Sequence, residues 1–228
     1  MKCDEKEFKR DKAFEPESPY VIVCEGFQDS GLICALLRQL NITNCDVTYP
    51  KKRRDGANGK DAIFKVLEVV SQQKVGGESL RGIAVVRDAD EDPEASFKET
   101  AAGFPAPYVA PKEGFTIEQA KYRTGIFLIP GKGKRGTLEH LLLDAVAAKN
   151  PPVVECVNKL ETCASWRIDW SSNKNAKMKM HSVVASFCKD DPGCSLGFIW
   201  SKKADNPMDI ASPVFKELED FLRAFSAP

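Results

Sequence analysis

The chain has 228 residues, of which 43% are hydrophobic and 29% are charged, as in an ordinary globular protein. Its 33 Lys and Arg residues equal its 33 Asp and Glu residues in number, so any binding to a polyanion must use local basic patches. We find no signal peptide and no apolar run near the roughly 20 residues that span a bilayer, so we expect a cytoplasmic protein without membrane partners.

Residues 1–19 are rich in charge and lack apolar periodicity, so we expect a mobile N-terminal arm. The chain then alternates between short apolar runs, typical of buried strands, and segments with helical spacing. We expect strands at 20–24, 45–49, 82–87 and 125–130, and helices at 30–40, 58–74, 93–102 and 137–148. This alternation predicts an α/β domain over residues 20–150, with a mostly parallel sheet and helices on both faces.

The alternation stops at the Asn150-Pro151-Pro152 sequence. Three more helices are expected after it, at 153–164, 177–188 and 213–225. The last has the clearest start, with Ser212 as its cap and Pro213 in its first turn. We therefore expect residues 151–228 to form a helical extension packed on the α/β domain.

Carboxylates follow two of the expected strands, at the point where each strand ends. Glu25 comes directly after the first strand, and Asp88, Asp90 and Asp92 follow the strand at 82–87. Open parallel sheets bind ligands at the carboxyl ends of their strands, so these acids should share one edge. Alternating aspartates suit a hard cation, because Mg²⁺ prefers oxygen ligands. The sequence therefore predicts a magnesium site, with a solvated acidic loop as the alternative.

Further acids lie close to this predicted edge. Gly26 allows a sharp turn after Glu25, which is a candidate general acid or base, a metal ligand, or a loop residue. Asp29 is placed to cap the helix at 30–40 and is a candidate additional acid. Glu139 would permit two-metal chemistry as a second acid, although we favour a first-turn glutamate that stabilises its helix.

Two basic segments are expected at the same edge. The first follows the second strand and consists of four cations, Lys51, Lys52, Arg53 and Arg54. The second precedes the helix at 137–148, where Gly131 and Gly133 would let backbone N–H groups hold a phosphate. Lys132 and Lys134 would position that phosphate or stabilise charge on a transferred group. A flexible charged loop is the alternative, and neither segment has the spacing of a P-loop.

The combination of Glu25-Gly-x-x-Asp29 with Asp88-x-Asp90 resembles the Toprim domain of topoisomerases, bacterial primases, recombination proteins and OLD-type nucleases. Within that family the chain looks most like small bacterial Toprim-like proteins related to the OLD group, over roughly residues 20–148. The resemblance implies a Toprim-like sheet and a magnesium-dependent phosphoryl-transfer site. In it, Glu25 would be the general acid–base group, Asp88 and Asp90 would bind the metal, and Asp92 would match a third acid of some members.

The chain shows no nucleophilic-tyrosine domain of a topoisomerase, no zinc-binding cysteines of a primase and no ATPase segment of an OLD nuclease. We therefore expect a stand-alone hydrolase that uses Mg²⁺ or Mn²⁺ to process DNA or RNA, with Glu25, Lys132 and Lys134 in catalytic roles. The alternative is a non-catalytic module that binds magnesium and a nucleotide or nucleic acid, and acts with a separate ATPase partner. An aspartate-phosphorylated signalling domain is disfavoured, because its acidic pair would follow the first strand.

Overall fold

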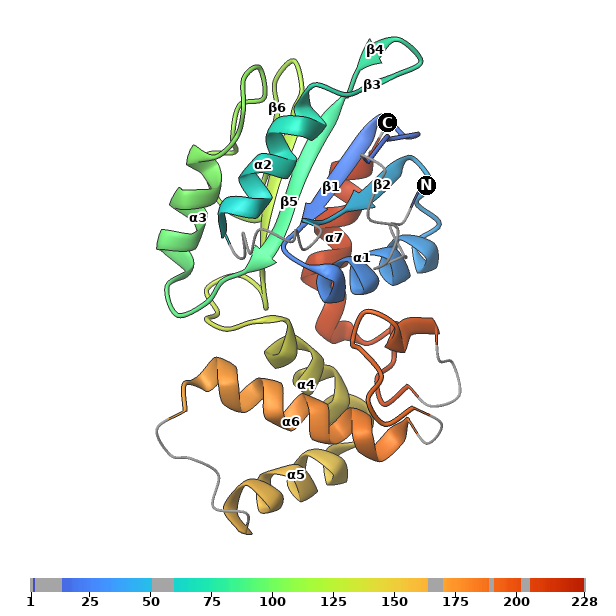
Figure 1. The fold of residues 1–228 in the computed structure, drawn as a ribbon, viewed down its shortest axis with the longest axis vertical. Helices are drawn as coiled ribbons and strands as arrows, with labels where there is room; N and C mark the ends of the chain where they lie inside the picture. Colours follow the sequence, from blue (N-terminus) through green and yellow to red (C-terminus); the bar gives the residue numbers. More distant parts are fainter. Residues whose placement is uncertain are drawn as a thin grey trace.

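The computed structural model describes residue 2 and residues 14–50, 60–163, 170–188, 191–201 and 206–227. Its centre is a five-stranded sheet with the order β2-β1-β5-β7-β6 (Figure 1). The four parallel strands are β1 (Tyr20–Cys24), β2 (Cys45–Thr48), β5 (Gly82–Asp88) and β7 (Arg123–Ile129). The edge strand β6 (Ile117–Gln119) is antiparallel to β7. The predicted α/β fold with a mostly parallel sheet is confirmed.

Helices α1 (Phe27–Gln39) and α7 (Lys216–Ser226) cover one face of the sheet, and Figure 1 shows α7 behind the strands. Phe221 of α7 packs against Phe127 of β7, with 5.4 Å between their ring centroids. Gly125 makes this close approach possible, because an added Cβ there would lie 2.9 Å from the Phe221 ring. The last predicted helix is therefore part of the main hydrophobic core.

Helices α2 (Lys60–Ser71) and α3 (Pro93–Ala102) cover the opposite face. Successive strand side chains alternate between faces, so Val21 and Val85 pack on the α2 side and Ile126 packs near α3. The remaining strands, β3 (Lys74–Val75) and β4 (Glu78–Ser79), form a separate antiparallel hairpin. The sequence patterns predicted the helices on both faces, and they missed this hairpin and β6.

The helical extension begins with α5 (Pro151–Cys163) and α6 (Ser172–Phe187), which pack on α4 (Leu138–Lys149). These three helices lie below the sheet in Figure 1. The chain then returns through the short 3-10 helices η1 (Ile199–Ser201) and η2 (Pro213–Phe215) to α7 on the sheet. Among the described residues, every helix falls short of the length and apolar character that crossing a membrane requires.

The described part of the predicted N-terminal arm is attached to β2. The carboxylate of Asp46 in β2 is fully buried and accepts hydrogen bonds from the backbone N–H groups of Lys2, Glu17 and Ser18, and from the Ser18 hydroxyl. The backbone N–H of Val47 also donates to the Lys2 carbonyl, at 2.9 Å. Lys2, Glu17 and Ser18 are therefore hydrogen-bonded to β2, and the mobility of the arm stays a prediction.

Removing the Phe221 ring should loosen α7 from the sheet. We expect Phe221→Ala to lower the free energy of unfolding by about 3–5 kcal/mol, because it leaves a cavity beside Phe127. Leu160→Ala is the control, since Leu160 of α5 is 42% exposed and should cost less than about 1 kcal/mol. Urea denaturation measures both, and equal costs for the two variants would contradict the packing described here.

Candidate functional site

The carboxyl ends of β1 and β5 lie side by side, as the sequence predicts for parallel neighbours. The register pairs Cys24 with Val86, and the Glu25 N–H continues the ladder by donating to the Val86 carbonyl at 3.0 Å. The Glu25 side chain then turns to the next strand, where its Oε2 accepts the backbone N–H of Asp88 at 3.2 Å. The two predicted acids therefore meet at one edge of the sheet.

A third element, the start of α4, reaches the same edge. Oδ1 of Asp88 accepts the backbone N–H of Leu138, the first residue of α4, at 2.8 Å. A carboxylate in this position is stabilised by the unpaired N–H groups and the dipole of the helix. Glu139 follows and is buried, with Oε2 accepting the Thr137 hydroxyl at 2.7 Å. The start of α4 therefore binds one acid of the edge and supplies another.

Glu25, Asp29, Asp88 and Glu139 form one electrostatic unit, which we call the acidic cluster. Loss of solvent raises the pKa of Asp88 well above its ordinary value, and the charges of Asp29, Glu25 and Glu139 raise it further. Burial also raises the pKa of Asp29 to about 7, with contributions from Glu25 and Glu139. Such repulsion favours proton uptake or a bound cation, because either one neutralises the shared charge.

The chemistry of the acidic cluster fits a hard cation, although its side chains are not yet arranged around one. Carboxylate oxygens are the ligands that Mg²⁺ prefers, and an ionised carboxylate keeps acceptor capacity beyond a single hydrogen bond. Among the described residues, however, no three His, Cys, Asp or Glu side chains stand in a metal-holding arrangement. Metal binding would therefore require side-chain rotation within the acidic cluster.

Asp29 holds the turn that carries Glu25. Its Oδ2 accepts the backbone N–H of Gly26 at 2.9 Å, and its side chain is buried. Because Gly26 is the N-cap of α1, the helix begins at Phe27, three residues before the predicted start. Asp29 therefore stabilises the start of α1 from within its first turn, rather than as the predicted cap, and also contributes charge to the acidic cluster.

Asp90 and Asp92 do not continue strand β5, which ends at Asp88. Asp90 has a φ of 54°, so the extended backbone ends before this residue and the strand alternation no longer applies. Its backbone pairs with Gly136 in both directions, at 2.9 and 2.8 Å. Asp92 caps α3, with Oδ1 accepting the backbone N–H groups of Glu94 and Ala95. These contacts give no support to Asp92 as a metal ligand.

The glycine-rich segment before α4 already binds one carboxylate of the protein itself. Gly131 and Gly133 have φ values of 147° and 72°, which favour glycine. The backbone N–H of Lys132 donates to Oε2 of Glu217 at 2.9 Å, so this donor is not open to a phosphate. The Lys132 and Lys134 side chains are exposed. One N–H of the predicted phosphate site is therefore bound to an internal acid, while both cations face solvent.

The other predicted basic segment, consisting of Lys51, Lys52, Arg53 and Arg54, lies outside the described residues.

Sequence reasoning missed Arg87, which contacts Glu25 at this edge, and His140, which links α4 to α6. Arg87 is only 1% exposed, and its Nε lies 3.6 Å from Oε2 of Glu25. His140 accepts the Thr137 N–H at Nδ1 and contacts the Ser172 hydroxyl through Nε2, at 3.0 Å, which links α4 to α6. Burial lowers the pKa of His140 below its ordinary value. The only sequence signal for Arg87 was a cation inside an otherwise apolar strand.

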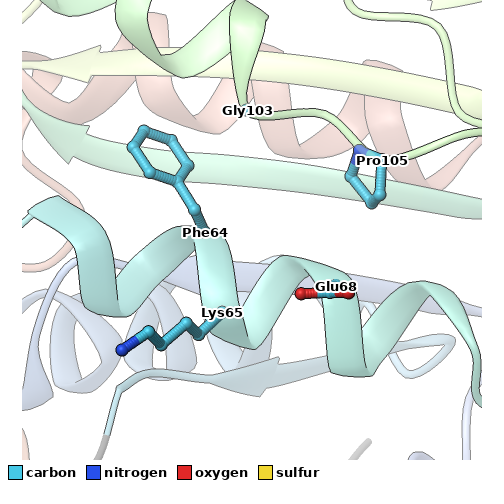
Figure 2. A pocket seen from close by; sticks show the side chains of 5 residues that line it. All are labelled: Phe64, Lys65, Glu68, Gly103 and Pro105. Carbon is cyan, nitrogen blue, oxygen red and sulfur yellow. The ribbon is translucent and has the colours of Figure 1, made fainter.

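Two hollows on the surface lie away from the acidic cluster. The first, of about 500 Å³, lies between α2 and the segment after α3, and Figure 2 shows the Phe64 ring directed toward Gly103 there. The second, of about 580 Å³, lies between α5 and α6 and has a mostly apolar lining. No residue of the acidic cluster lines either of these two hollows.

Comparison with protein families gives one match, to a family described as a protein of unknown function, DUF3226, over residues 19–226. No curated protein and no solved structure matches the chain. The matched segment runs from just before β1 into the end of α7, so the sheet, the acidic edge and the helical extension all fall within it. The chain belongs to the DUF3226 family.

Proposed function

We propose that the protein is a magnesium-dependent phosphodiester-processing enzyme, in its simplest form a nuclease, with a Toprim-like acidic site. The observation that carries this proposal is the contact between Glu25 and Asp88 across the neighbouring ends of β1 and β5. Asp29 and Glu139 add charge to the same place, as the raised pKa of Asp88 reflects. A cluster of carboxylates with perturbed pKa values is a recognised mark of a functional site.

The residues of the acidic cluster would divide the chemistry between them. A bound Mg²⁺ or Mn²⁺ would neutralise the charge of a phosphodiester and polarise it. Asp88, with Glu139 or Asp29, would hold this ion through carboxylate oxygens. Glu25 would accept a proton from the attacking oxygen or donate one to the leaving oxygen. Oδ1 of Asp88 accepts the Leu138 N–H, which places this carboxylate at the start of α4.

The exposed cations of the segment before α4 would bind the substrate. Lys132 and Lys134 lie between β7 and α4, and α4 begins at the acidic cluster. Their side chains are exposed, so they can contact phosphates of DNA or RNA that flank the reacting one. This role needs only the side chains, because Glu217 occupies the Lys132 N–H.

A second candidate function is binding without catalysis. It is favoured by the Lys132 N–H, a predicted phosphate donor that is bound to Glu217 instead. In this function the acidic cluster would hold Mg²⁺ and a nucleotide or nucleic-acid end, and a separate ATPase would supply turnover. Metal binding without cleavage of any nucleic acid would distinguish this function from the first.

The nuclease proposal predicts that the purified protein cleaves or nicks DNA or RNA when Mg²⁺ or Mn²⁺ is added. We expect Glu25→Gln to lower the cleavage rate by about 100-fold or more, because a general acid–base group contributes at least this much. Asp88→Asn should have a similar effect through loss of the metal. Glu155→Gln, on the exposed surface of α5, is the matched control and should cleave at the wild-type rate. Wild-type cleavage by Glu25→Gln would exclude the proposed acid–base role.

Mutual repulsion in the acidic cluster also predicts an unusual pH dependence of stability. The pKa of Asp29 is raised in the folded state, so between its ordinary value and about 7 the folded protein binds more protons than the unfolded one. Stability of the metal-free protein should therefore fall as this carboxyl loses its proton. We expect thermal unfolding from about pH 6 to about pH 8 to show a fall in Tm that Asp29→Asn reduces.

Added Mg²⁺ should raise the Tm more at the higher pH, because there the ion no longer competes with protons. Glu155→Gln again serves as the control, and its pH dependence should match that of the wild type. The same pH dependence in wild type and Asp29→Asn would contradict the electrostatic account. No effect of Mg²⁺ on the wild-type Tm at the higher pH would contradict the metal site.

A further inference from the structure

Arg87 is a fully buried cation in β5, directly before Asp88. Its side chain points to the α3 side of the sheet, where Nη1 contacts Oε2 of Glu99 at 3.1 Å and Oγ1 of Thr100 at 3.2 Å. Its Nε lies 3.6 Å from Oε2 of Glu25. Burying a guanidinium costs free energy unless its partners compensate, so a cation at this position calls for a physical reason.

The contact with Glu25 supplies such a reason. Oε2 of Glu25 accepts the Asp88 N–H and lies within ion-pair distance of Arg87 Nε, which makes no hydrogen bond, so consecutive residues of β5 contact the same oxygen. Asp88 is in turn fixed to the start of α4. Arg87 and the Asp88 N–H therefore place Glu25, and Leu138 of α4 places the Asp88 carboxylate.

The far end of Arg87 is held by a well-anchored helix. Thr100 is fully buried and donates its hydroxyl hydrogen to the Ser96 carbonyl at 2.7 Å, which leaves its oxygen to accept from Arg87. The Ser96 hydroxyl donates to the Ala89 carbonyl at 3.0 Å, which ties α3 to the segment after β5. The guanidinium is therefore fixed in relation to the strand that carries Asp88.

We propose that Arg87 is a positioning residue for Glu25, held in place by Glu99 and Thr100 of α3. The proposal rests on the proposed function, in that it gives Glu25 its orientation for proton transfer beside Asp88. A guanidinium suits this task, because its planar fork can contact carboxylates on two sides at once, whereas a lysine ammonium is a single point charge. The chain of contacts thereby connects α3 to the acid–base group of the site.

The test compares Arg87→Met, Arg87→Lys and the control Arg81→Met in cleavage assays with Mn²⁺. Arg81 is exposed, before the start of β5, and its variant should behave like the wild type. We expect Arg87→Met to lower kcat by about 10-fold or more with little change in KM, and Arg87→Lys to recover only part of this loss. In a Glu25→Gln background, Arg87→Met should cause no further loss, because it acts through Glu25.

Additive losses in the double variant would overturn the proposal, since a merely structural role would not depend on Glu25. Should Arg87→Met fail to fold, Glu99→Gln gives the second test, because Glu99 is partly exposed. It should lower kcat in the same direction by a smaller factor, again with no further loss in the Glu25→Gln background.

A structural measurement, which does not depend on enzymatic activity, tests this proposal separately from the proposed function. Crystal structures of the wild type and Arg87→Met, both free of metal, would report the separation of Glu25 Oε2 from the Asp88 nitrogen, here 3.2 Å. A displaced Glu25 carboxylate in the variant supports positioning by Arg87, even if the wild type cleaves nothing. An unmoved carboxylate overturns it, even if the wild type is an active nuclease.

Discussion

Parallel pairing of β1 with β5 brings the carboxylates of Glu25 and Asp88 to one edge of the sheet, where the Glu25 carboxylate accepts the Asp88 N–H. Asp88 is compensated by the Leu138 N–H at the start of α4. Glu25 is compensated by the Asp88 N–H and by the buried Arg87. Burial, together with the charges of Asp29, Glu25 and Glu139, still raises the pKa of Asp88 well above its ordinary value. Bound positive charge would stabilise this edge, and this is the physical basis of the proposed cation-dependent function.

Helix α4 joins this edge to the rest of the molecule. Its first turn contacts the acidic cluster, and its body packs on α5 and α6 in the helical extension. His140 connects that first turn to Ser172 at the start of α6. The chain then returns to the sheet, where Glu217 of α7 binds the Lys132 N–H in the segment before α4. The helical extension is thus coupled to the candidate site at both of its ends.

Much of the fold could be predicted because it follows from local periodicity, as in β1, where the predicted and observed bounds agree. The meeting of Glu25 with Asp88 followed from the parallel topology alone. Positions that depend on tertiary contacts could not be predicted in this way. Asp90 leaves the strand conformation, and the Lys132 N–H binds Glu217, which is 85 residues away in the sequence. Nothing local to Arg87 indicated its contact with Glu25.

The central claim is that the acidic ends of two neighbouring strands share one divalent cation. The most direct test is a crystal of the protein soaked in Mn²⁺, with anomalous density sought at the acidic cluster. The account predicts a peak within coordination distance of carboxylate oxygens of Asp88 and of Asp29 or Glu139, with the side chain of Asp29 or Glu139 rotated toward the ion. Absence of a peak there, while Mn²⁺ binds elsewhere on the molecule, would contradict it.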